Sequence, residues 1–422
     1  MFAFHETTRK RICRTAFFAL CVAPTLATGL WIASHYMPGA RGRTARVLGD
    51  VLDVHVKLAD WRYPRPRTVR SAGITLSDPA SGSLLAELSR MEAKQGGEVR
   101  ALTVKQVRVD ASQLLALGGK VDRWLAKLPP QTQEIVIDSL VVTLPSDGAG
   151  GGVREFVLSP VRGRVDRDAA GRARVRILAQ VAGLDASDAA VQLTLEPSTE
   201  SGSASASVTL DARGAEIPAS LLAAVAPGFG SFGTESQFMG VVQWTLDRPL
   251  PRGVVQGRLE NADMASILPA GAPHSLRGRA TIELQELSWR GARLERLAGS
   301  LHAEKGQISR SLVDALAKNF QCGATDGVLA AEDPTMLSLD LLAVRFEMDA
   351  SGLTLWGDCP AVANLPTGCM AVSGSQPLLV QSPFDKWHLG VLVQTLAAPG
   401  VTWMPATDEA VDLAERLPLP RK

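Results

Sequence analysis

The stretch RARVRILAQV, residues 172–181, decides the fold class of this chain. Apolar side chains stand at every second position from Ala173 to Val181, and Arg or Gln fills most of the positions between them. A strand with this alternation has one apolar and one polar face, which is typical of antiparallel sheets and not of parallel sheets buried on both faces. We therefore expect an antiparallel strand here.

The same period of two recurs along the chain. It governs residues 52–58, 191–195, 204–210, 280–284 and 297–303. Clusters of turn-forming residues separate such segments at hairpin spacing, at 147–152, 168–171 and 247–253. The sequence thus predicts a mainly β protein with an elongated antiparallel sheet.

Short helices are expected between the strands. Ala111 opens a segment whose apolar residues follow helical spacing until Pro129 and Pro130 stop it. Similar short segments occupy 217–222, 264–268 and 309–320, the last with Ser309 and Ser311 in capping positions. A unit of strands followed by a short helix therefore recurs, with an irregular period.

The N-terminus carries a membrane-anchor pattern. A basic cluster that ends at Arg14 is followed by Thr15–Ala40, which contains no charged side chain. Such a stretch is long enough to cross a bilayer as one helix. We expect a cytoplasmic basic tail over 1–14, a transmembrane signal-anchor helix over 15–37, and a large exported domain after it.

A cleaved signal peptide is the alternative to an anchor. Small residues around Thr25, Leu26 and Ala27 have the spacing that signal peptidase reads. Apolar sequence continues past that point to Ile32, and Trp31 suits a membrane interface. These flanks favour the retained anchor.

Two parts of the sequence resemble a known family. The opening, with a basic tail, a span, Leu48–Asp50 leading a strand, RSAGITLSDP over 70–79 and a strand over 84–93, is similar to that of AsmA-like envelope proteins. The phrases LRGRA at 276–280 and GQISRSLVDAL at 306–316 are similar to the C-terminal part of the same group. The likeness covers residues 1 to 320.

The resemblance to AsmA-like and TamB-like proteins carries its own expectations. It implies a bacterial inner-membrane protein whose β-rich periplasmic region, here 38–355, curls into a taco-shaped groove with an apolar interior. It also implies a role in outer-envelope biogenesis or in phospholipid movement. The expected partners are the inner membrane, phospholipid and other envelope proteins.

The apolar face of the sheet is the candidate site. An open sheet must cover such a face with helices, a second sheet or acyl chains. Partial cover by helices would leave a groove that can bind lipid, whereas complete cover would make a closed core. The groove candidates are Val175, Ile177, Val181, Val191, Leu193, Leu195, Val208 and Leu210. With a closed core, the protein would instead be a tethered β scaffold that binds another envelope protein and carries no lipid.

A basic aromatic stretch follows the span. Trp61 stands beside Arg62, Arg65 and Arg67, and this combination suits anionic lipid headgroups. A packed Trp next to a solvated Arg-Pro turn is the alternative interpretation.

The C-terminal segment 356–422 is rich in Pro, so its strands are expected to be short or at sheet edges. A terminal helix is expected over 407–417. Of the five cysteines, Cys359 and Cys369 are the closest exported pair and could close a short disulfide in an oxidising compartment.

No enzyme or cofactor motif stands out. Gly228, Gly230 and Gly233 spell GxGxxG, but no convincing strand precedes them, so a loop is expected. The histidines are scattered and no close ligand pair suggests a metal site. A net charge of +1 gives no electrostatic reason for a nucleic-acid partner. The sequence predicts a non-catalytic protein without a cofactor.

Overall fold

The computed structural model describes most of the chain. The described residues are 6–36, 38–65, 67–96, 99–114, 116–118, 120, 124, 132–144, 154–167, 171–182, 190–198, 205–226, 229–245, 252–268, 272–291, 293–324, 335–360, 365–384 and 386–396.

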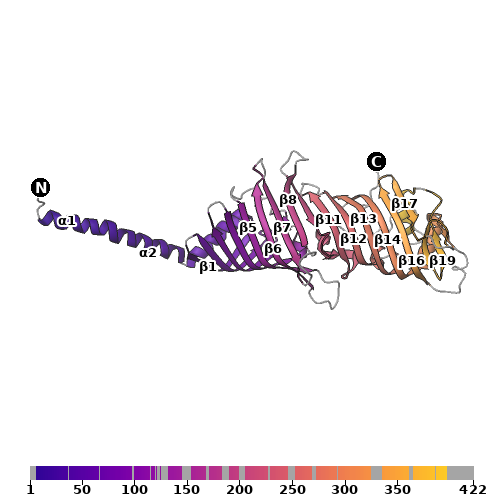
Figure 1. Cartoon of the computed structure of the whole chain (residues 1–422), viewed down its shortest axis with the longest axis horizontal. Coiled ribbons are helices and arrows are strands. Elements are labelled where there is room, and N and C mark those ends of the chain that lie inside the picture. Colours follow the sequence, from indigo (N-terminus) through magenta and orange to yellow (C-terminus); the bar gives the residue numbers. More distant parts are fainter. Residues whose placement is uncertain are drawn as a thin grey trace.

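A helical stalk precedes the sheet (Figure 1). It consists of α1 (Glu6–Phe17), the π-helical turn η1 (Phe18–Val22), α2 (Ala23–Tyr36) and α3 (Pro38–Leu52). Within it, Lys10–Leu30, 21 residues long, is apolar and long enough to cross a membrane. This stretch overlaps the expected span over 15–37. Side chains such as Leu20, 76% exposed, contact nothing that would cover them.

The remainder of the described chain forms one curled, unclosed sheet of nineteen strands. Its strands are β1 (His55–Arg65), β2 (Thr68–Ser77), β3 (Leu84–Gln95), β4 (Val99–Asp110), β5 (Thr132–Leu144), β6 (Arg154–Arg167), β7 (Ala173–Val181), β8 (Ala190–Ser198), β9 (Ser205–Asp211), β10 (Ile217–Pro218), β11 (Gln237–Thr245), β12 (Arg252–Asp263), β13 (Leu276–Arg290), β14 (Arg293–Ser309), β15 (Gly323–Ala324), β16 (Met336–Asp349), β17 (Gly352–Gly357), β18 (Cys369–Ser373) and β19 (Gln376–Val380).

The strands follow one another along the sheet nearly in chain order, which gives the molecule its elongated shape (Figure 1). Neighbours are antiparallel throughout, except that β4 and β5 run parallel. A parallel pair needs a crossover, and the segment after Ala111 supplies it. The expected mainly β fold with short helices, an N-terminal helix and an elongated curled antiparallel sheet is confirmed.

Short helices lie between and after the strands. They are η2 (Ala111–Gln113), η3 (Ala219–Ala224), η4 (Phe229–Phe232), η5 (Met264–Ile267), α5 (Arg310–Asn319) and α7 (Leu389–Leu396). Four of them, η2, η3, η5 and α5, begin where a strand ends. Asp110 and Asp263 end strands, and their carboxylates accept hydrogen bonds from the amides of the following helices at 2.8 and 3.0 Å. Ser309 caps α5 in the same way, as the sequence predicts. A strand, a capping residue and a helix therefore form the recurring unit.

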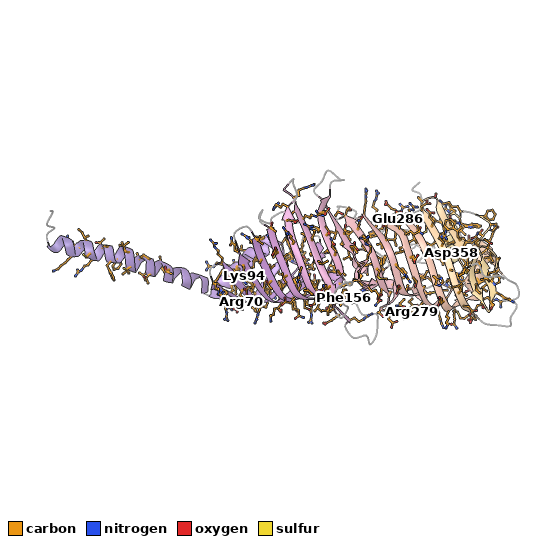
Figure 2. The ribbon with its side chains drawn as sticks, in the orientation of Figure 1. Arg70, Lys94, Phe156, Arg279, Glu286 and Asp358 are labelled. Atoms are coloured by element: carbon orange, nitrogen blue, oxygen red, sulfur yellow. The ribbon has the colours of Figure 1, made fainter. Side chains whose placement is uncertain are left out.

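The core lies on one face of the sheet and is divided along its length. At the stalk end, α3 packs Leu48 and Leu52 on the first strands. In the middle, Leu222 of η3 and Phe229 of η4 are fully buried against β11 and β12. At the far end, α5 and α7 cover β14 to β19. The opposite, outer face carries ion pairs such as Arg70 with Glu92 at 2.9 Å (Figure 2).

Candidate functional site

One row of apolar residues crosses the inner face of the sheet from β2 to β17. Each member lies directly opposite the next on the neighbouring strand, so all point to the same side. We call this the central row. Its members are Val69, Ala93, Leu102, Ile135, Gly163, Ile177, Leu193, Leu210, Val242, Val255, Leu287, Leu297, Met348 and Leu353.

Burial along the central row changes abruptly. From Val69 on β2 to Leu210 on β9 its side chains are only half-buried. The next two members, Val242 and Val255, are 0% exposed. The change falls where η3 and η4 pack on the sheet. Farther along the row Leu287 and Leu297 are half-buried again, and Met348 and Leu353 are 5% and 6% exposed. The row is thus closed at β11 and β12, and its stalk-side part from β2 to β9 stays accessible.

Buried residues flank this accessible strip on both sides. Towards one rim, Val165, Val175, Leu195 and Val208 form a parallel row, each no more than 7% exposed. Towards the other rim, Val104, Val161, Ala179 and Val191 are similarly buried. On β6 to β9 the accessible surface is therefore a narrow apolar strip between two buried rows. On β3 to β5 the row on its rim side continues as Gln95, Arg100 and Gln133, which are not buried.

The structure brings the residues expected in the groove onto one face, in different environments. Ile177, Leu193 and Leu210 belong to the accessible strip. Val175, Leu195 and Val208 lie in one of the buried rows. The last two, Val181 and Val191, belong to the sealed cluster under η3 and η4. Sequence reasoning missed the stalk-side members of the strip, Val69, Ala93, Leu102 and Ile135, although their strands also alternate.

The expected headgroup residues separate in the structure. Trp61 lies opposite Ser71, which lies opposite Met91, so its indole faces the inner side, where its ring packs edge-on against Tyr63 at 6.3 Å. Arg62 points outward and pairs with Asp60 at 2.9 Å. Arg65 and Arg67 are exposed at the β1–β2 turn. Lipid binding by these arginines stays a prediction, while Trp61 is placed for packing.

A buried lysine ties the stalk to the sheet. Lys120, 6% exposed, comes from the crossover between β4 and β5. Its ammonium donates to the Asp53 carbonyl at 2.8 Å and pairs with the Asp78 carboxylate at 2.9 Å. The hydrogen bond from Lys120 lowers the pKa of Asp78 to about 2, with further bonds from Ser81. Trp124 donates its indole N–H to the Leu52 carbonyl, so the end of α3 is held twice. No sequence signal marks this joint.

The two cysteines near the C-terminus, Cys359 and Cys369, lie side by side. The amide of Cys359 donates to the carbonyl of Cys369 at 3.1 Å, and both side chains are free thiols in contact with each other. Burial, reinforced by Cys369, raises the pKa of the Cys359 thiol to about 12. The Cys359–Cys369 disulfide stays a prediction, and the two thiols lie close to each other. The strands of this segment, β18 and β19, are short as expected, and the terminal helix over 407–417 lies outside the described residues.

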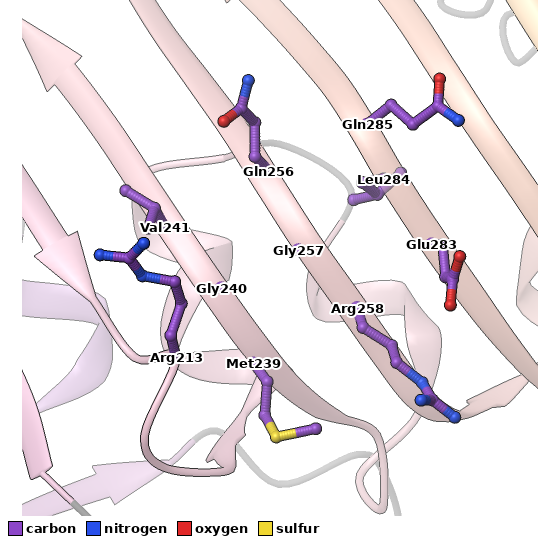
Figure 3. A pocket seen from close by; sticks show the side chains of 10 residues that line it. All are labelled: Arg213, Met239, Gly240, Val241, Gln256, Gly257, Arg258, Glu283, Leu284 and Gln285. Atoms are coloured by element: carbon purple, nitrogen blue, oxygen red, sulfur yellow. The ribbon is translucent and has the colours of Figure 1, made fainter.

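A shallow hollow occupies the outer face of β11, β12 and β13 (Figure 3). Met239, Arg258 and Glu283 form one cross-strand row in it, and Val241 and Gln256 form the next. Its mixed lining and its position opposite to the central row separate it from the apolar strip.

Other sequence motifs hold no assembled chemistry in the part of the chain that is described. Gly230 lies within η4, and Gly228 is outside the described residues. Among the residues whose positions are given, no three His, Cys, Asp or Glu side chains come together in a way that could hold a metal ion.

Comparison with known proteins adds no assignment. No protein-family model, no curated protein and no solved structure matches this chain. The resemblance of its sequence to the AsmA-like group stays a prediction.

Proposed function

We propose that this protein is a membrane-anchored envelope protein of the AsmA-like kind that binds lipid acyl chains on the accessible part of its central row. The observation that carries the proposal is the half-buried apolar strip from Val69 to Leu210. An apolar strip open to water costs free energy that an acyl chain would recover. The function is non-catalytic: lipid is held and not altered.

The dimensions of the strip support this ligand. It crosses the strands from β2 to β9, which at strand spacing is roughly 34 Å. One leaflet of a bilayer core, and hence one acyl chain, measures about 15 Å. The strip therefore has room for at least one diacyl lipid.

The helical stalk supports a location at a membrane. Lys10–Leu30 would anchor the chain, with the basic residues before it in the cytoplasm and the sheet in the periplasm. Because α3 continues from the anchor directly onto β1, the accessible end of the sheet would be the end nearer the inner membrane. Lipid could then pass from that membrane to the strip in outer-envelope biogenesis.

Site-specific photocrosslinking in cells tests the proposal. A benzophenone amino acid at Leu193, on the strip, should crosslink to lipid under ultraviolet light. The matched control is Leu178, an apolar neighbour on the same hairpin that is 47% exposed on the outer face. Both variants keep the membrane helix, so lipid around the anchor contributes equally to each.

The outcomes separate the two candidate functions. Lipid adducts at position 193 but not at 178 support the groove. Protein adducts at 193, with no lipid, would overturn it and favour the tethered scaffold that binds another envelope protein. The same readout from Ile177 and Leu210 would map the strip.

A further inference from the structure

A cation, Arg100, lies on the inner face of the sheet beside the apolar strip. Arg100, near the start of β4, lies opposite Gln95 of β3 and Gln133 of β5. On its own strand, Leu102 and Val104 follow on the same face. The three side chains Gln95, Arg100 and Gln133 thus form a polar patch where the apolar rows reach the rim. We call it the inner polar patch.

The guanidinium of Arg100 has no partner within the described structure. Its Nε atom is buried without a hydrogen bond, and no described carboxylate pairs with it. Nearby acids do not serve it: Glu92 faces outward and binds Arg70 and Lys94, at 2.9 and 3.3 Å.

Other arginines of the sheet behave differently. Arg108 and Arg176, for example, point outward and pair with Glu155 and Asp166, at 3.2 and 2.9 Å. A buried, unpaired guanidinium nitrogen is costly. An anionic ligand that accepts hydrogen bonds from this guanidinium would remove that cost.

We infer that Arg100 binds the phosphate of a lipid whose acyl chains lie on the central row. This inference rests on the proposed function and deepens it by assigning the residue that binds the phosphate of the lipid headgroup. The planar guanidinium presents paired N–H donors that match phosphate oxygens. Amide groups of Gln95 and Gln133 flank it and supply further donors. The next inner-face residue on β4, Leu102, belongs to the central row. The lipid headgroup would therefore contact the inner polar patch while its acyl chains contact the adjacent central row.

The experiment compares lipids that differ only in phosphate. Full-length protein in mild detergent is titrated with phosphatidic acid and with diacylglycerol of the same chains, and bound lipid is measured by native mass spectrometry. Wild type should prefer phosphatidic acid by about tenfold or more, as expected for a charge-assisted bidentate contact. Arg100→Gln should remove the preference while diacylglycerol still binds.

Lys105→Gln is the matched control, because Lys105 is an exposed cation on the same strand and its loss changes net charge equally. It should keep the preference. Thermal unfolding of each variant establishes that the fold persists. A third titration with inorganic phosphate tests whether phosphate alone suffices.

Each result decides the matter. Equal binding of both lipids by wild type, equal loss of both in Arg100→Gln, or displacement of phosphatidic acid by millimolar inorganic phosphate would overturn the headgroup site while leaving an acyl-chain strip intact. Failure of wild type to bind either lipid would instead remove the proposed function itself, and the headgroup site with it.

Discussion

The indole ring of Trp289 occupies the space that a Cβ atom on Gly253 would need. The two residues lie directly opposite each other on β12 and β13. Trp289 is 4% exposed, so the ring is fixed over its neighbour and cannot swing into solvent. Glycine is required here because of what packs on it.

Adding a side chain at this position should destabilise the protein. Gly253→Ala should lower the free energy of unfolding by about 1–3 kcal/mol, since an overpacked core must shift its side chains or backbone. Denaturant unfolding followed by tryptophan fluorescence measures it. Gly42→Ala is the control, because a Cβ on Gly42 meets nothing within 4 Å. Equal stability of Gly253→Ala and wild type would contradict the packing.

Burial along the sheet predicts unequal costs for the same truncation. Leu259→Ala, at a site 0% exposed on β12, should cost about 3 kcal/mol. Leu193→Ala, in the accessible strip, should cost about 1 kcal/mol in lipid-free protein because less area leaves water. Urea denaturation of both variants provides the comparison. A cost at Leu193 as large as that at Leu259 would mean that the strip is sealed.

The Lys120–Asp78 pair predicts a pH dependence of stability. The folded pKa of Asp78, about 2, lies below its ordinary value of 3.8. Its contribution is therefore complete above about pH 4 and is lost as pH falls through about 2. Asp78→Asn should melt below wild type at pH 6, and the difference should shrink between pH 4 and pH 2. Glu304→Gln, on an 81% exposed side chain, should show no such pattern. A difference that persists unchanged at pH 2 would exclude the ion pair as its cause.

The adjacent thiols predict a selective oxidation. Glutathione disulfide should join Cys359 to Cys369: an S–S bond forms between them, the glutathione S–S bond breaks, and the two thiol protons and the electron pair pass to the two glutathione thiols that result. The raised pKa of Cys359 predicts slow uncatalysed reaction, faster with a thiol–disulfide oxidoreductase. Peptide mapping after alkylation should find Cys322 still reduced. Alkylation of Cys359 and Cys369 after complete oxidant treatment would refute the pairing.

Local sequence patterns predict the individual strands and helices of this fold better than they predict how the strands pair. Alternation at 173–181 and 191–195 predicts the strands β7 and β8 and the face that is apolar. Ser309 predicts the start of α5 because a cap acts within one turn. The central row is different, because it depends on pairings such as Leu210 with Val242 that no local pattern encodes.

The orientation of the inner polar patch also could not be predicted from the local sequence. Around Arg100 the sequence reads VRALTVKQV, in which both alternating sets contain apolar residues. Which set faces inward is decided by the parallel pairing with β5. The contact of Lys120 with Asp53 joins residues far apart in the chain, so it too needs the assembled sheet.

The cover of α5 and α7 over the far strands has a further meaning for any cargo. The strip is closed at the end away from the stalk. A lipid that enters beside the stalk would therefore have to leave from the same side. Under the proposed function, delivery across the whole envelope would require a second carrier that receives lipid at the stalk-side opening. Under the same proposal, this chain would take up and release lipid at its stalk side only.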